Sequence, residues 1–355
     1  MKKIEAKIVA DSISPQGHRI TSMLLTYPRF IHSELMTHRM FSRNSASSRA
    51  IPFEKMVKMV EEDPFVPIVW QKIHKGMQGT EYITDDRVIK AKNSNWVRAS
   101  EEAIRYAKYL NSNVVEHDIC FRDNKEKVIT YNHMNDSKLF SESDVFIEDT
   151  GVTKQLCNRL LEPFMWHTVL VTATEWENFF ELRCPKYQTP VSRTVEPQRS
   201  WKDLLAIHSN PANEKLITDN KNNWFFKMQY SLSSAEIHIQ ALAEAMWDAM
   251  NESTPKLLKA GEWHIPFGDK IDLFKLAKSS DVPQDFYESE CEYDADSDSF
   301  YQSYLVPQMI KITTARCARL SYMTFDGEID YEKDIKLHDH LLESKHYSPF
   351  EHCAR

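Results

Sequence analysis

The densest polar stretch of the chain is Thr37-His38-Arg39-Met40-Phe41-Ser42-Arg43-Asn44-Ser45-Ala46-Ser47-Ser48-Arg49. An apolar segment precedes it and Ile51-Pro52 follows it, so we expect a structured turn here. The stretch contains three arginines, a histidine, an asparagine and four serines, which together offer many hydrogen-bond donors and few acceptors. Guanidinium groups, hydroxyls and free backbone N–H groups suit phosphate oxygens. The stretch therefore indicates an anion site, and the alternative is a solvated loop with serine caps.

The segments around this stretch predict a mixture of strands and helices. Apolar alternation over 6–26 predicts strands, and Pro28 suits the first turn of a helix that continues to Met36. A short helix over 154–161 is expected to end at Pro163, because proline removes a backbone donor. The other predicted elements are helices over 56–61 and 96–110 and a buried strand over 164–172.

Two capping-box spacings predict helix starts later in the chain. One runs from Thr174 to Glu177 and the other from Ser233 to Glu236, each followed by apolar residues at helical spacing. Glu236 is best explained as a capping residue. Polar residues over 186–222 predict a long surface excursion, and the acidic segment 280–300 predicts a solvated loop.

Composition excludes several classes of protein. Lys+Arg 44 against Asp+Glu 52 gives a net charge of −8, which argues against a nucleic-acid binder that works by bulk charge. The chain has only 7 glycines, and neither GxGxxG nor GxxxxGK[ST] occurs in it. The absence of these motifs argues against a Rossmann dinucleotide-binding domain and against a P-loop.

The cysteines and the hydropathy pattern indicate a cytoplasmic protein. Six scattered cysteines form no CxxC pair, which argues against a zinc ribbon and a disulfide scaffold, and no metal site is expected. No apolar run approaches the ~18 residues that a membrane span needs, and the N-terminus turns polar too soon for a signal peptide.

Single residues outside the polar stretch are ambiguous when taken alone. Arg159 lies just before Pro163, and Arg183 ends a predicted helix, where an arginine is often only a partner of the helix dipole. Cys184 follows without a recognisable base, and a lone cysteine of that kind is more often inert than nucleophilic.

Taken together, these pieces resemble the flavin-dependent thymidylate synthases. The signature of that family is Arg-His-Arg, seven residues and then Ser, which reads here as Thr37-His38-Arg39, seven residues and Ser47. Before this loop the upstream helix matches too, with Pro28 at the expected distance and Glu34 where a Gln is usual. Further matches are Asn44 and Arg49 in the same loop, Arg159 with Pro163, Asn178 with Arg183, Ala235-Glu-Ile-His-Ile-Gln240, Ala318-Arg319-Leu-Ser321-Tyr322 and Ser348-Pro-Phe-Glu-His352.

The order of the matching blocks differs from the usual family. There the last two blocks come first and run directly into the strand before the signature, whereas here they end the chain at 315–355. The sequence is therefore similar to a circular permutant, as in phage-encoded members. The resemblance implies an α+β fold of thymidylate-synthase-complementing-protein type, with a twisted, mainly antiparallel sheet flanked by helices. It implies one catalytic domain over 1–355 with insertions around 56–150, 186–230 and 255–310.

The resemblance also implies an activity. Members methylate dUMP to dTMP with 5,10-methylenetetrahydrofolate, FAD and NADPH, without an enzyme thiol, and are usually homo-tetramers with sites built across subunits. It implies small-molecule substrates and neither nucleic acid nor membrane as a partner. The implied catalytic residues are Arg183 and Ser47; the dUMP-binding residues are Glu34, Ser47, Arg49, Arg159 and Arg183; and the FAD or folate contacts are His38, Arg39, Asn44, Asn178, Ser321 and His352.

Departures from the family pattern leave alternatives open. Thr37 replaces an Arg, Ser45 replaces a Glu that usually helps to hold flavin, and Glu236 and His238 replace Gln and Glu. One alternative is a related enzyme that transfers a hydroxymethyl group or acts on dCMP. Another is a catalytically silent flavin- or nucleotide-binding protein, because the chain stops three residues after His352.

Overall fold

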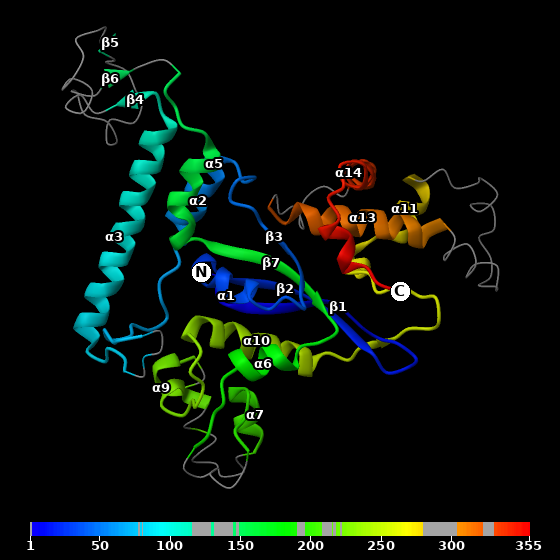
Figure 1. The fold of residues 1–355 in the computed structure, drawn as a ribbon, viewed down its shortest axis with the longest axis horizontal. Coiled ribbons are helices and arrows are strands. Elements are labelled where there is room, and N and C mark those ends of the chain that lie inside the picture. The colour runs from blue at the N-terminus through cyan, green and yellow to red at the C-terminus, as the bar shows by residue number, and fades with distance from the viewer. Residues whose placement is uncertain are drawn as a thin grey trace.

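The computed structural model describes residues 2–76, 79, 81–115, 129–130, 145–146, 149–189, 196–207, 215, 218–220, 222–279, 304–321 and 330–355. The acidic segment 280–300 lies outside these residues, as does Tyr322. Figure 1 shows a sheet across the middle of the molecule, with α10 and α6 below it, α13 above it, and α2 and α3 at one end. The fold is thus α+β, as the sequence analysis predicts.

The main sheet has five strands in the order β3-β7-β2-β1-β8. The first four pair antiparallel, and β8 pairs parallel with β1, so the expectation of a mainly antiparallel sheet is confirmed. A small antiparallel sheet has the order β4-β6-β5. The strands are β1 (Glu5–Ile13), β2 (Arg19–Pro28), β3 (Ser42–Ser45), β4 (Val114–Val115), β5 (Ile129–Thr130), β6 (Val145–Phe146), β7 (Trp166–Ala173) and β8 (Lys256–Leu257).

Helices cover both faces of the main sheet, and α2 and α3 pack against η2 at the end of the sheet where β7 begins. The α-helices are α1 (His32–Met36), α2 (Phe53–Glu62), α3 (Asp86–Asn111), α5 (Lys154–Cys157), α6 (Glu177–Arg183), α7 (Trp201–Ala206), α9 (Trp224–Met228), α10 (Ile237–Glu252), α11 (Leu273–Ser279), α13 (Val306–Ala318) and α14 (Tyr331–Glu343). The 3-10 helices are η1 (Arg29–Ile31), η2 (Asn158–Phe164), η3 (Gly268–Lys270), η6 (Arg319–Ser321) and η7 (Ser348–His352).

The two sheet faces differ in character because side chains alternate along each strand. Leu25 and Val171, with the residues two positions away along each strand, point to one face and pack against α6 and α10 in the largest apolar cluster. Burying each such large side chain contributes about 1.5–3 kcal/mol. The opposite face carries Leu24 and Leu170 but also hydroxyl side chains, and it lies under the C-terminal part of the chain.

Three local predictions are wrong in detail. Thr174 is not a cap, because α6 begins only after Trp176, and the Glu175 carboxylate accepts the Glu177 N–H at 2.8 Å instead. Ser233 is not a cap either, although Glu236 is, accepting the N–H groups of two residues in the first turn of α10. The α-helix before Pro163 ends at Cys157, and 3-10 helix η2 continues through that proline, whose missing N–H this short helix tolerates.

The segment 186–222, in its described parts, is more than a polar excursion. Tyr187, Trp201 and Leu204 are buried together as a small apolar cluster beside α9. Lys227 of α9 forms a buried ion pair with Glu244 of α10, at 3.0 Å between Nζ and Oε2. The polar composition of this segment therefore did not reveal that it contributes a small apolar cluster next to α10.

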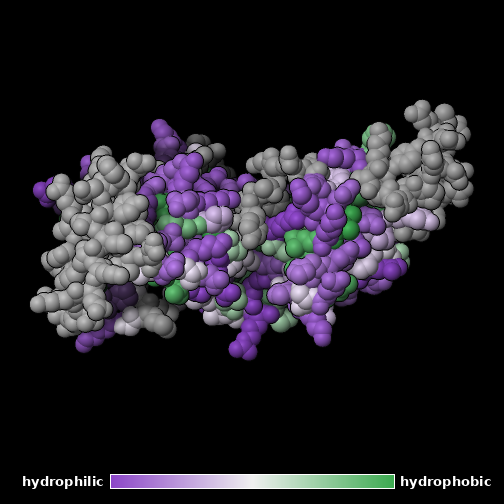
Figure 2. Space-filling model, turned by 90° about the horizontal axis from the view of Figure 1, so that it is seen from above, coloured by the Kyte–Doolittle hydropathy of each residue, from purple (hydrophilic) through white to green (hydrophobic). Residues whose placement is uncertain are grey.

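The exterior is mostly hydrophilic on the side seen in Figure 2, with hydrophobic residues showing in small areas. Within the described part of the chain, none of the helices has the length and apolar character needed to cross a membrane.

Candidate functional site

The end of α1 and the end of α6 meet at a corner built around His38. The His38 ring lies beside Phe41, at 5.9 Å between centroids, and edge-on to Phe179 at 4.9 Å. Its Nε2 accepts a hydrogen bond from Arg183 Nε at 3.1 Å, and Arg183 Nη2 donates to Thr37 Oγ1 at 3.4 Å. Burial, together with nearby arginines, lowers the pKa of His38. A neutral His38 therefore accepts from Arg183 and orients its guanidinium.

Arg43 has a structural role that the sequence did not reveal. Its Nη1 donates to the carbonyl oxygens of Leu35, Met36 and His38, at 3.4, 3.0 and 3.0 Å. These are carbonyls at the end of α1, which a helix leaves without intrahelical partners. Arg43 thus stabilises the turn that contains His38 and leads from α1 into β3.

The loop after β3 is fastened to η2. Buried Asn158 donates from Nδ2 to the carbonyls of Ser48 and Ile51, at 2.7 and 3.0 Å, and Ser48 Oγ donates to Glu162 Oε1 at 2.5 Å. The neighbouring side chains of Ser47, Arg49 and Arg159 are exposed at this same corner.

These three residues form what we call the phosphate corner: Ser47, Arg49 and Arg159. Among the described residues Arg159 has a single, loose ion pair, at 4.0 Å from Glu162, with 52% of its side chain exposed. Two guanidinium groups and a hydroxyl, on the loop after β3 and on η2, suit a phosphate dianion, which prefers charge-assisted and bidentate donors.

Arg183 does not join the phosphate corner within one chain. Ser42 of β3 lies opposite Thr172 at the α6 end of β7, whereas Ser45 lies opposite Val169 nearer η2. The four-residue strand spans roughly 10 Å. The predicted nucleotide residues are therefore divided between the two ends of β3, with Glu34 on α1 and hydrogen-bonded by Ser33 Oγ at 3.0 Å.

The C-terminal blocks pack against the strand that follows the His38 corner. Asn44 Nδ2 donates to the carbonyl of Cys317 at 3.3 Å, and η6 and η7 both contact β3. His352, fully buried, bonds through Nδ1 to Thr172 Oγ1 at 2.8 Å. Arg319 instead binds Asp334 of α14 at 2.7 Å, and the side chain of Ser321 lies outside the described residues.

The donor set fits FAD at its polar parts. Arg39 and Asn178 are exposed and have no hydrogen-bond partner among the described residues, so both can address diphosphate or ribityl oxygens. Asn44 Oδ1 and His352 Nε2 are buried and have no hydrogen-bond partner among the described residues. The described residues contain no group of three or more His, Cys, Asp or Glu arranged to hold a metal ion.

Cys184 is placed as an inert thiol. It is fully buried, its Sγ donates to the carbonyl of Arg199 at 3.1 Å, and burial, with Glu244 nearby, raises the pKa of the thiol. The thiolate is the nucleophilic form, so this environment supports the prediction of a cysteine without a catalytic role.

Two of the four departures have structural roles. Glu236 caps α10, and its Oε1 bonds His238 Nδ1 at 2.5 Å. His238 Nε2 accepts the N–H of Ile68 at 3.1 Å, and its ring packs edge-on between Phe30 and Phe65. Through these contacts Glu236 and His238 hold the segment at Ile68 against the start of α10.

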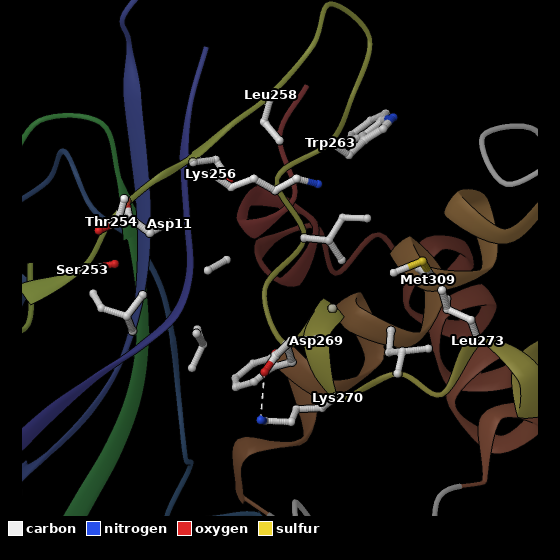
Figure 3. Close-up of a pocket in the computed structure, with 18 residues that line it drawn as sticks. Asp11, Ser253, Thr254, Lys256, Leu258, Trp263, Asp269, Lys270, Leu273 and Met309 are labelled. Carbon is white, nitrogen blue, oxygen red and sulfur yellow. Dashed lines mark ion pairs between the residues drawn. The ribbon is translucent and has the colours of Figure 1, made fainter. Parts of the chain in front are cut away.

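A cavity of about 740 Å³ lies beside β1, apart from these corners (Figure 3). Asp11 and Lys256 line it on one side, and Trp263 and the α13 residue Met309 on the other, with Lys270 ion-paired to Asp269 at 2.8 Å. None of the residues predicted for the site lines this cavity.

No family model and no curated protein matches the chain. Two solved structures similar to it are of a UMP/dUMP methylase. The protein is PolB from Streptomyces cacaoi, bound with 5-Br UMP in one structure and with 5-Br dUMP in the other. The first is 16% identical and covers 68% of this chain and 95% of its own, with a TM-score of 0.31. The second is 14% identical and covers 66% and 98%, with a TM-score of 0.34.

Proposed function

We propose that this chain is a circularly permuted flavin-dependent thymidylate synthase that methylates dUMP at C5. The observation that carries the proposal is the packing of the two C-terminal blocks on the strand of the signature. Asn44 bonds the Cys317 carbonyl, and His352 bonds Thr172, which lies opposite Ser42. Segments about 270 residues apart in the sequence are therefore in contact, which supports a permuted order of the family's blocks.

The position of His352 also supports the permutation. Thr172 Oγ1 is 2.5 Å from Ser22 Oγ, and Ser22 is the fourth residue of β2. In the unpermuted family order, the block that ends in His352 runs directly into the strand before the signature, which here is β2. The block that ends in His352 therefore lies near β2 in space, which supports the proposed permutation.

The phosphate corner would hold the nucleotide phosphate, with Ser47, Arg49 and Arg159 as donors. Arg183, oriented by His38, would address the pyrimidine edge and stabilise negative charge as it develops in the ring. Since the two corners lie at opposite ends of β3, a homo-tetramer with sites shared between subunits is part of the proposal.

Arg39, Asn44, Asn178 and His352 would hold FAD. When bound and reduced by NADPH, FAD would supply the hydride that completes the methyl group, and 5,10-methylenetetrahydrofolate would supply its carbon. The residues of this chain orient the rings and exclude water. The buried thiol of Cys184 has no part in the reaction.

Mass spectrometry of the products tests this proposal against its alternatives. The full-length protein is incubated with FAD, NADPH and methylenetetrahydrofolate, and with dUMP and dCMP together. A methyl gain on dUMP alone is the expected result. A hydroxymethyl gain, or any gain on dCMP, would favour the related modifying enzyme, whereas bound FAD without turnover would favour a silent flavoprotein.

A further inference from the structure

A continuous row of hydrogen-bonded side chains crosses the sheet face beneath the C-terminal segment. We call it the imidazole–hydroxyl row: Ser12, His264, Ser22, Thr172 and His352. Its successive contacts are Ser12 Oγ to His264 Nδ1 at 2.9 Å, His264 Nε2 to Ser22 Oγ at 2.9 Å, Ser22 Oγ to Thr172 Oγ1 at 2.5 Å, and Thr172 Oγ1 to His352 Nδ1 at 2.8 Å. All five residues are at most 5% exposed.

The row also anchors the end of the chain. His264 and Ala354 exchange two backbone hydrogen bonds, at 2.7 and 3.2 Å, so His264 is fixed from both its backbone and its ring. No family motif includes His264, and no sequence pattern singled it out. Only the fold brings it within reach of β1 and β2.

The row permits two complete hydrogen-bonding directions. Each hydroxyl donates one hydrogen and each neutral imidazole carries one N–H, so the direction of one bond fixes that of the next. In one direction Ser12 donates to His264 and Thr172 donates to His352 Nδ1, which leaves the His352 proton on Nε2. In the other, His352 Nδ1–H donates to Thr172, and His264 Nδ1–H donates to Ser12.

The surroundings of His352 Nε2 favour the second direction. This atom is buried and has no hydrogen-bond partner among the described residues. An orphaned buried N–H is rarer and costlier than an under-used acceptor. Burial lowers the pKa of His264 and of His352 to about 4, so both rings are neutral near pH 7.

We propose that His264 is a positioning residue: its Nε2 accepts the Ser22 hydroxyl and so completes the row in the direction that keeps His352 in the Nδ1–H tautomer. Nε2 is then a hydrogen-bond acceptor on the sheet face that also carries Asn44, whose Oδ1 is a second buried acceptor without a partner in the described chain. The use of these acceptors for an N–H of the flavin or pterin ring rests on the proposed function. The tautomer itself does not.

Long-range ¹H–¹⁵N correlation on full-length protein labelled with [¹⁵N]histidine reads the tautomer directly, with His352 assigned by its loss in His352→Gln. We expect Nδ1–H in the wild type. His264→Phe keeps a ring but no nitrogen, so the Ser22 hydroxyl turns toward Thr172 and Nδ1–H is lost as the dominant form. His264→Gln retains an acceptor for the Ser22 hydroxyl and is expected to preserve the Nδ1–H tautomer of His352.

Thr172→Val provides the second test, because it keeps the shape and removes the hydroxyl that Nδ1 contacts. Should His264→Phe fail to fold, loss of the Nδ1–H form in Thr172→Val supports the proposal. An Nε2–H tautomer in the wild type, or an unchanged tautomer in Thr172→Val, overturns it. The predicted tautomer without methylation of dUMP refutes the proposed function alone, and methylation with the opposite tautomer refutes the positioning role alone.

Discussion

Lowering the pH from 7 to 5 is expected to destabilise the fold through its buried imidazoles. His264 is 1% exposed, and burial is the main reason that its pKa falls from 6.5 to about 4 in the folded chain. The unfolded chain binds a proton below about pH 6.5, whereas the folded chain resists it until about pH 4. Stability is therefore lost as the pH falls through this window.

The magnitude follows from the two pKa values. At pH 5 an unfolded histidine is almost fully protonated and a folded His264 is about one-tenth protonated, which makes the loss about 2 kcal/mol between pH 7 and pH 5. Such a loss is large against the 5–15 kcal/mol of a typical domain.

Urea unfolding of the wild type and of His264→Gln at both pH values isolates this residue. Gln cannot titrate, so the wild type should lose about 2 kcal/mol more than the variant on acidification, whatever the variant loses at pH 7. Equal losses in the two proteins would mean that His264 is protonated as readily in the folded chain as in the unfolded chain, and would refute the buried neutral row.

Three further substitutions test other parts of the structure. Cys184→Ala should leave turnover within a few-fold in a product assay, because the buried thiol lies outside the proposed chemistry; a folded but inactive variant would contradict this. Asn158→Leu leaves the Ser48 and Ile51 carbonyls unsatisfied and should cost about 2–4 kcal/mol in urea unfolding, whereas an unchanged midpoint would show that the loop is held otherwise. Glu244→Gln leaves a buried lysine without its counter-charge and should lower unfolding free energy by about 3–5 kcal/mol, with a loss below about 1 kcal/mol arguing against a buried pair.

The sequence predicted the elements whose pattern is local. Apolar alternation predicts β2, the apolar run over 164–172 predicts β7 as a buried strand, and Arg183 is expected in the last turn of its helix, where α6 has it. The predicted cap at Thr174 was wrong because a nearby carboxylate, that of Glu175, takes the first N–H group. The capping-box spacing alone does not show whether Thr174 or Glu175 accepts this N–H group.

The residues that the sequence did not reveal act across long separations. Asn158 holds a loop 107–110 residues before it, and His264 bonds side chains 242 and 252 residues away. Neither lies in a pattern that distinguishes it from an ordinary polar residue. Arg43 illustrates the same limit at short range, since its three carbonyl partners depend on how the end of α1 turns into β3.

The central claim is that the phosphate corner binds the phosphate of a pyrimidine deoxynucleotide. Calorimetric titration with dUMP and with deoxyuridine, which lacks the phosphate, tests it most directly in the wild type and in Arg49→Ala. Arg87→Ala, which removes an exposed arginine from the first turn of α3, is the matched control.

We expect Arg49→Ala to raise the Kd of dUMP tenfold or more, since a lost charge-assisted hydrogen bond is worth about 1.5–3 kcal/mol. The same variant should bind deoxyuridine as the wild type does, and Arg87→Ala should bind both ligands normally. Unchanged dUMP affinity in Arg49→Ala, or an equal loss for dUMP and deoxyuridine, would contradict the claim.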